Sequence, residues 1–106
     1  MSISYRLRYI ADLVTTGYII ADIGTDHGYV PVYLLRCGKI PRAIAVDISP
    51  GSLQKARELA MRCHLTDRMD LRLGDGLSCV APGEAQCIIL CGMGGILMRR
   101  ILEEGR

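Results

Sequence analysis

Apolar positions recur at two different spacings along the chain, which predicts that helices and strands alternate. A helix is expected before Gly17, with an apolar stripe formed by Ile3, Leu7, Ile10 and Val14 and with Ser2 or Ser4 as its cap. Apolar runs predict strands at 18–21, 43–47, 70–73 and 86–91. Further helices are expected at 31–36, at 50–63 after the N-cap Ser49, and at 96–104.

This alternation predicts an α/β fold with a parallel sheet. Right-handed crossovers with a reversal after the third strand give a Rossmann-like strand order of 3-2-1-4. Ligands in such sheets bind beyond the carboxyl ends of the strands. Each predicted strand ends in a Gly-rich or acidic cluster, at 22–28, Asp47, 75–76 and 92–95. Gly and Asp are also common turn formers, but clusters after every strand favour a ligand site at this edge.

The most informative cluster is Asp22-Ile23-Gly24-Thr25-Asp26-His27-Gly28. Its Asp-x-Gly-x-x-x-Gly spacing differs from the dinucleotide pattern Gly-x-Gly-x-x-Gly and is typical of S-adenosylmethionine (SAM) sites. Asp47 ends the next strand, where a carboxylate binds the hydroxyls of a ribose. Asp75 beside Gly76 is placed either to hold an adenine amino group or to form a plain turn. Asp26 and His27 either cap the loop or face a substrate.

Composition narrows the class of protein. The 106 residues suit one domain, half of them are apolar, and the net charge of +2 does not by itself indicate nucleic acid. No apolar run is long enough to span a bilayer, and no signal peptide is apparent. The 5 cysteines and 2 histidines lack the spacing of a metal site. We therefore expect reduced, mostly buried thiols in a cytoplasmic protein without a metal.

Together these segments resemble the N-terminal part of the TrmK-type bacterial tRNA (adenine-N1)-methyltransferases. The matching segments are Ser4-x-Arg6-Leu7, 21–29, Pro31-x-Tyr33-Leu34, Ala45-x-Asp47, 73–77 and Gly92-Met93-Gly94-Gly95 followed by Ile101-Leu102. The Thr-Asp-His and Gly-Met-Gly-Gly blocks are specific in combination. The resemblance covers essentially the whole chain and implies a class I methyltransferase domain that uses SAM to methylate N1 of an adenine in tRNA.

The resemblance also implies roles for individual residues. Cofactor contacts are expected from Asp22, Gly24, Thr25, Gly28, Asp47, Ile48, Asp75 and Gly76. Catalytic roles are expected for Asp26, Gly92 and Met93, and substrate contacts for His27, Tyr29, Gly94 and Gly95. For Tyr29, stacking on a base and packing in the interior are equally good interpretations.

The chain is shorter than the members of that family, which continue with further strands and a helical region thought to engage tRNA. We therefore expect residues 1–106 to be the N-terminal portion of a SAM-binding domain, as a fragment or a split gene product, with weak or absent tRNA binding. An unpaired fourth strand would favour self-association. The alternatives are a non-catalytic nucleotide-binding or assembly module and a nicotinamide-dependent oxidoreductase domain.

Overall fold

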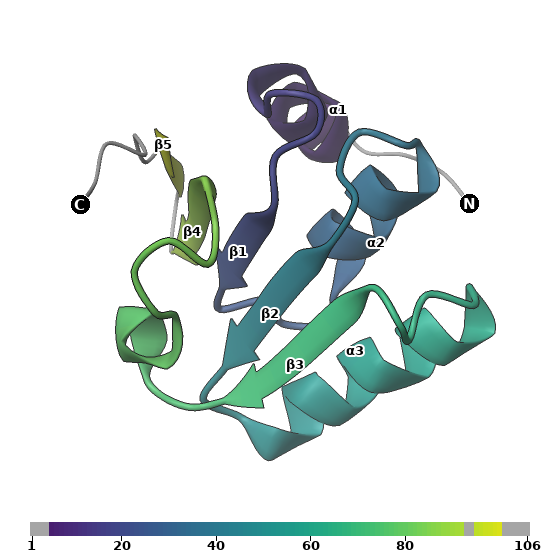
Figure 1. The fold of residues 1–106 in the computed structure, drawn as a ribbon. Helices are drawn as coiled ribbons and strands as arrows, with labels where there is room; N and C mark the ends of the chain where they lie inside the picture. The colour runs from purple at the N-terminus through teal and green to yellow at the C-terminus, as the bar shows by residue number, and fades with distance from the viewer. Residues whose placement is uncertain (1–4, 93–94, 101–106) are drawn as a thin grey trace.

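The computed structural model describes residues 5–92 and 95–100, which form a five-stranded sheet with helices packed against it (Figure 1). The elements are α1 Tyr5–Leu13, β1 Ile20–Ile23, α2 Tyr29–Arg36, β2 Ala43–Asp47, α3 Pro50–Arg62, β3 Met69–Leu73, the 3-10 helix η1 Gly76–Cys79, β4 Cys87–Gly92 and β5 Gly95–Arg100. The expectations for Ser2, Ser4, Met93, Gly94 and 101–104 lie outside the described residues.

The parallel strands follow the order β3-β2-β1-β4, which confirms the predicted arrangement. The central strand β1 places Ile20 opposite Ala43 of β2 and Cys87 of β4. Asp47, the last residue of β2, pairs with Leu73, the last residue of β3. The carboxyl ends of neighbouring strands therefore share one edge of the sheet, and the predicted clusters follow them there.

The expected helix at 96–104 is wrong over the part that the structure describes, because residues 95–100 form the strand β5. β5 runs antiparallel to β4, from Gly92 opposite Gly95 to Cys87 opposite Arg100. Only two residues, 93 and 94, separate these strands. Such a short connection suits an antiparallel hairpin, and a short apolar run such as Ile96-Leu97-Met98 does not distinguish a strand from a helix.

The pairing of β5 also overturns the expectation of an unpaired fourth strand. β4 is bonded to β1 on one side and to β5 on the other. An open strand edge is what templates pairing with another chain, and β4 offers none. The predicted self-association through β4 therefore loses its structural basis.

The two faces of the sheet are covered differently. Residues of α1, α2 and α3, among them Ile10, Leu34 and Ala60, pack with Ile20 and Ile89 on one face. On the other face the buried cluster is formed by sheet residues together with Ala85, Cys79 and Val80 from the segment between β3 and β4. All three α-helices thus lie over one face, and the segment with η1 lies over the other (Figure 1).

The thiols differ from the expectation of mostly buried cysteines. Of the cysteines whose burial the structure describes, Cys87 is buried, Cys63 and Cys79 are half-buried and Cys37 is exposed. Cys87 lies in β4, an interior strand of the sheet. Cys37 and Cys63 are the residues that follow α2 and α3, where each helix ends near the surface.

Gly28 sets the contact between α2 and α3. It precedes α2 in a left-handed conformation, with φ of 82°. A Cβ atom at Gly28 would lie 2.9 Å from the Cβ atom of Ala56 in α3. The absence of a side chain therefore permits both the backbone conformation and the close helix contact. The resemblance implies a cofactor contact at Gly28, and in the structure a neighbouring helix, α3, lies against this residue.

Replacing Gly28 should cost more than replacing a glycine with the same backbone strain but free space. Gly38 has φ of 77° and no atom within 4 Å of an added Cβ, so it is the matched control. We expect Gly38→Ala to lower the free energy of unfolding by about 1–2 kcal/mol from backbone strain alone. Gly28→Ala should lower it by about 2–5 kcal/mol, because overpacking is added. Urea unfolding measures both, and equal losses would contradict the close contact.

Arg72 of β3 holds the segment between β3 and β4 in place. Its Nη1 donates to the carbonyl of Cys79 at 2.7 Å and to Oε1 of Glu84 at 2.7 Å, and its Nη2 donates to Oε2 of Glu84 at 2.9 Å. The same guanidinium reaches Oδ2 of Asp70 at 2.7 Å. The Arg72 guanidinium and the Ala81 N–H lower the pKa of Glu84 from 4.5 to about 2.

This carboxylate should make folding stability depend on pH. Because the pKa of Glu84 is lower in the folded chain, its stabilising effect is full above pH 4.5 and is lost as the pH falls towards about 2. Urea unfolding at pH 6 and pH 3 should show a smaller acid loss of stability for Glu84→Gln than for the wild type. Arg72→Met should reduce that loss in the same way, since Arg72 is the main cause. Identical pH dependence in all three chains would contradict the ion pair.

Candidate functional site

Asp47 connects the loops at the carboxyl edge of the sheet. Its Oδ2 accepts the N–H of Asp26 at 2.8 Å, and its Oδ1 accepts the N–H of Ser49 at 2.9 Å. Its backbone carbonyl accepts the N–H of Gly74 at 3.0 Å. One residue therefore bonds to the loops that follow β1, β2 and β3. A carboxylate has about four lone-pair positions, so two remain for a ligand.

The loop after β1 folds back towards β2. The N–H groups of Gly24 and Thr25 both donate to the carbonyl of Val46, at 2.8 and 2.9 Å. Asp22 lies inside β1 rather than in the loop, with 1% of its surface exposed, and Thr25 is 5% exposed. The Thr25 hydroxyl donates to Oδ2 of Asp22 at 2.8 Å. These two side chains hold the loop from inside, while Gly24 lies at the surface.

Asp26 is exposed in this loop, and His27 beside it is half-buried. Asp26 adopts φ of 61°, a left-handed conformation that Asp tolerates better than most residues. Its side chain is 71% exposed, and its Oδ1 lies 3.8 Å from Nε2 of His27. The His27 ring contacts Tyr29 edge to face, with centroids 5.7 Å apart. Tyr29 is 50% exposed, so the interior-packing interpretation of this tyrosine is wrong.

The loop after β3 brings exposed apolar side chains to the same edge. Asp75 is exposed and precedes η1, and its carbonyl accepts the Ser78 hydroxyl at 2.8 Å. Ile48, directly after Asp47, is 69% exposed, and Leu77 in η1 is 51% exposed. Large apolar side chains at the surface beside a carboxylate suit a ligand that has both an apolar face and polar edges.

The end of β4 contributes backbone to this edge. Leu90 of β4 pairs with Ile23 of β1, so Gly92 lies two residues beyond the end of β1. Gly95 begins β5 opposite Gly92. The structure thus brings together Asp26, Asp47 and the loop of Asp75, with Gly92 on the neighbouring strand, while Met93 and Gly94 lie outside the described residues.

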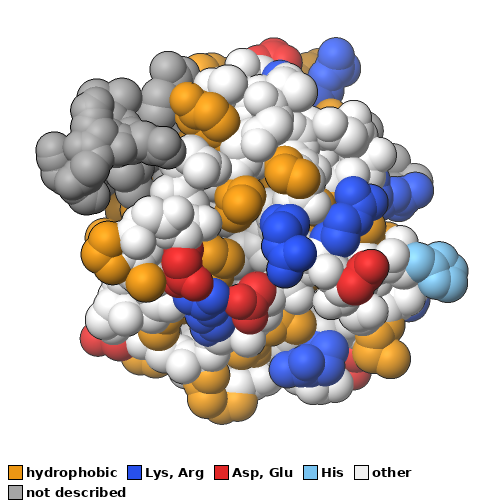
Figure 2. All heavy atoms as spheres, in the orientation of Figure 1, with side chains coloured by type: hydrophobic (Ala, Val, Ile, Leu, Met, Phe, Trp, Pro, Cys, Tyr) orange, Lys and Arg blue, Asp and Glu red, His pale blue; other side chains and the backbone are white. Residues whose placement is uncertain are grey.

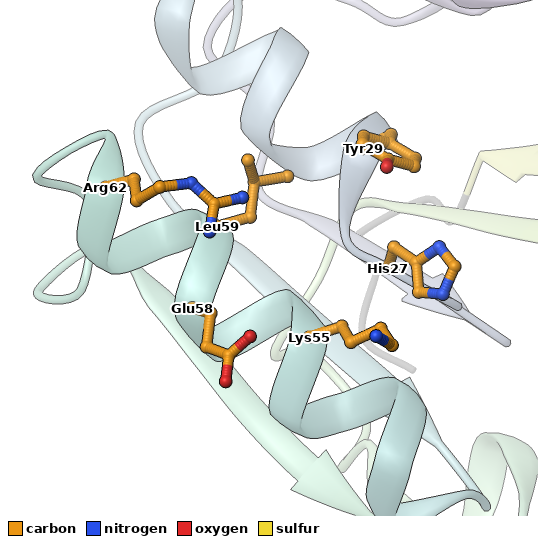
Figure 3. A pocket seen from close by; sticks show the side chains of 6 residues that line it. All are labelled: His27, Tyr29, Lys55, Glu58, Leu59 and Arg62. Atoms are coloured by element: carbon orange, nitrogen blue, oxygen red, sulfur yellow. The ribbon is translucent and has the colours of Figure 1, made fainter.

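A second feature was missed by the sequence analysis. A hollow of about 300 Å³ lies between the start of α2 and α3 (Figure 3), lined by His27, Tyr29, Lys55, Glu58, Leu59 and Arg62. Lys55, Glu58 and Arg62 lie on the exposed side of α3, away from its buried residues Leu53, Ala56 and Ala60. The spacing of these three residues along the helix does not predict that His27 and Tyr29 lie near them. Only the packing of α2 against α3 brings the two rings and the three charged side chains together.

Within the described residues, no group of three or more His, Cys, Asp or Glu side chains is arranged to hold a metal ion. In the same part of the chain, no helix has the length and apolar character needed to cross a membrane. Figure 2 shows basic side chains spread over the part of the visible face that lies over β2, β3 and α3.

Comparison with known proteins agrees with the geometry. The family described as "Methyltransferase domain" matches residues 3–106. The tRNA (adenine(22)-N(1))-methyltransferase of Bacillus subtilis is 38% identical over 106 residues, which are 100% of this chain and 44% of that protein. The chain therefore spans less than half the length of this curated relative.

Solved structures are similar as well. The crystal structure of the B. subtilis m1A22 tRNA methyltransferase TrmK has a TM-score of 0.82 at 36% identity, over 88% of this chain and 40% of that one. TrmK from M. capricolum, in complex with S-adenosyl-homocysteine (SAH), has a TM-score of 0.77 at 35% identity, over 87% of this chain and 42% of that one. Streptococcus pneumoniae Sp1610, in complex with SAM, has a TM-score of 0.80 at 34% identity, over 88% and 44%.

These matches confirm the resemblance to TrmK-type proteins and the Rossmann-like methyltransferase fold, and they do not favour the oxidoreductase alternative. The chain belongs to the methyltransferase domain family.

Proposed function

We propose that this chain is the cofactor-binding part of an enzyme that transfers a methyl group from SAM to N1 of an adenine in tRNA, at position 22. The observation that carries this proposal is the arrangement around Asp47, a carboxylate with free lone pairs beside exposed apolar side chains at the carboxyl edge of the sheet. The similarity of the whole chain to a tRNA (adenine(22)-N(1))-methyltransferase supports the choice of substrate. In this proposal residues 1–106 are one portion of a SAM-binding domain in a cytoplasmic protein.

The residues at this edge fit SAM. The two remaining lone-pair positions of Asp47 match the paired hydroxyls of a ribose. The exposed side chains of Ile48 and Leu77 offer apolar surface to an adenine ring. The exposed Asp75 carboxylate can accept a hydrogen bond from the amino group of that adenine. Gly24 lies at the surface of the loop and lets a ligand approach its backbone closely. Asp22, Thr25 and Gly28 then act indirectly, since they are buried and hold this loop.

When bound, SAM supplies an electrophilic methyl group. Adenine N1 carries its own lone pair, so the chain needs no strong general base. It must instead place the adenine in line and stabilise the positive charge that grows on the ring. Asp26 is suited to both tasks, because its exposed carboxylate can accept a hydrogen bond from the adenine amino group and can balance the positive charge. The hydrogen bond from its N–H to Asp47 fixes the position of Asp26 relative to the carboxylate that is proposed to bind the ribose.

Among the other expected residues, His27 lies beside Asp26, and Gly92 lies at the carboxyl end of a neighbouring strand. His27 lies within 3.8 Å of the Asp26 carboxylate and can orient it. The backbone of Gly92 lies at the end of the neighbouring strand, and Gly95 pairs with it. We assign substrate contacts to His27, Tyr29, Gly94 and Gly95, and we assign backbone carbonyls at 92 and 93 to holding the adenine.

Cofactor binding should depend on Asp47. We expect calorimetric titration of this chain with SAH to show micromolar binding, with no comparable heat for NAD. Asp47→Asn keeps the shape and one acceptor oxygen but loses a charged acceptor, so affinity should fall about 10- to 100-fold. Asp12→Asn, an exposed residue of α1, is the control and should bind as the wild type does. A folded wild-type chain that binds NAD as well as SAH, or neither, would refute the proposed site.

Asp26 should affect turnover more than cofactor affinity. With SAM and tRNA as substrates, Asp26→Asn should lower the methylation rate by about 100-fold or more, since Asn tolerates the left-handed backbone but carries no charge. Its affinity for SAH should stay within about threefold of the wild type, because the N–H to Asp47 is kept. Asp26→Ala should show the same division, and equal losses of turnover and affinity would contradict the role of Asp26.

A further inference from the structure

The hollow between α2 and α3 lies beside the proposed active site and shares with it His27 and Tyr29, to which substrate contacts are assigned. The contact of Gly28 with Ala56 places the neighbours of Gly28, which are His27 and Tyr29, beside the neighbours of Ala56 on α3. The backbone N–H of Asp26 donates to Asp47, and the next residue, His27, lines the hollow (Figure 3). A molecule that reaches the active site past Asp26 would therefore also meet this hollow.

The hollow offers cations that have no anionic partner. Lys55 and Arg62 are two helical turns apart on α3, so they lie on the same side of the helix. Glu58 between them has the spacing for an ion pair with either one. Within the described residues, however, neither Lys55 nor Arg62 forms an ion pair or a side-chain hydrogen bond. The Glu58 carboxylate instead accepts a hydrogen bond from the side chain of Gln54 at 3.4 Å. Both cations remain available to an external anion.

The same hollow offers an exposed aromatic ring, and one half-buried leucine also lines it. Tyr29 is 50% exposed, and its edge-to-face contact with His27 leaves it ordered against a second ring. Leu59 is half-buried between the two helices. Unpaired cations combined with an exposed aromatic side chain are the combination by which proteins hold single-stranded nucleic acid, through phosphates and stacked bases. A site for a small anion alone would have no use for the exposed ring.

We propose that this hollow binds RNA, with Lys55 and Arg62 contacting backbone phosphates and Tyr29 stacking on an unpaired base. The proposal rests on the proposed function, which makes tRNA the RNA that this chain meets. It assigns a tRNA contact to the methyltransferase domain itself, where the sequence alone led us to expect weak or absent binding. The phosphates supply affinity and position, and the stacked base fixes the strand beside Asp26.

Fluorescence anisotropy with labelled tRNA at 50 mM salt, a low value chosen because phosphate contacts weaken with salt, tests the proposal directly. The double variant Lys55→Glu with Arg62→Glu should weaken tRNA binding by at least about tenfold. It should also reduce the slope of the logarithm of the binding constant against the logarithm of the salt concentration by about one to two. The control is Arg36→Glu with Arg57→Glu, which changes the net charge equally at exposed positions outside the hollow. It should weaken binding much less.

Variants of Tyr29 separate stacking from charge. Tyr29→Ala should lose at least about fivefold in tRNA affinity, whereas Tyr29→Phe keeps the ring and should bind nearly as the wild type does. Tyr9→Ala, an exposed tyrosine of α1, should also bind normally. Circular dichroism of each variant confirms that it is folded.

The outcomes distinguish this proposal from the proposed function. Equal losses of tRNA affinity in the two charge-reversed double variants would show general electrostatic attraction and would overturn the proposed RNA site. A wild-type chain that binds SAH but no tRNA at low salt would also overturn it, in favour of a protein partner for the hollow. Failure of SAH binding would instead refute the proposed function, whatever the tRNA result. Normal SAH binding by all hollow variants, together with the selective loss of tRNA binding, would establish the site.

Discussion

The carboxyl edge of the sheet depends on the hydrogen bonds of Asp47. Parallel strands deliver three loops to this edge, and each loop leaves N–H groups that need acceptors. Asp47 accepts from Asp26 and Ser49 through its side chain and from Gly74 through its carbonyl. The donors of Ser49 and Gly74 are half-buried, and such a donor left without an acceptor costs more than a typical hydrogen bond contributes, so these bonds constrain the loops after β2 and β3. The bond from the exposed Asp26 ties the loop after β1 to the same residue. The same carboxylate keeps two lone-pair positions for a ligand.

The unequal coverage of the sheet explains where the exposed surfaces lie. The three α-helices cover one face, and the segment after β3 covers the other because Arg72 bonds to Cys79 and Glu84 within it. That segment carries Asp75 and Leu77, which follow the carboxyl end of β3. On the helical side, the contact of Gly28 with Ala56 brings two helices together at one point and leaves the hollow beside it. The Asp47 carboxylate and the hollow are therefore connected through the single loop of Asp26 and His27.

The sequence predicted this fold best where local signals and burial agree. Ser49 accepts the N–H of Ser52 at 3.2 Å and Pro50 begins α3, as the capping pattern indicated. The apolar runs of β2 and β4 became central strands. The prediction failed at Ile96–Met98, where a run of three apolar residues fits a helix or a strand equally well. There the backbone pairing with β4 decided the outcome, and this pairing depends on a strand whose position the local sequence does not encode.

By itself, the sequence determined the order of helices and strands up to β4 and the identity of the clusters at the strand ends, because period, caps and glycine spacing are local properties. The order of the parallel strands followed from the handedness of their crossovers. Only the tertiary structure decided which members of those clusters face outward. Asp22 and Thr25 turned inward, whereas Asp26, Ile48 and Tyr29 are exposed. Tertiary structure also decided that Lys55 and Arg62 lie beside Tyr29, since residues far apart in sequence meet only when two helices pack at a glycine.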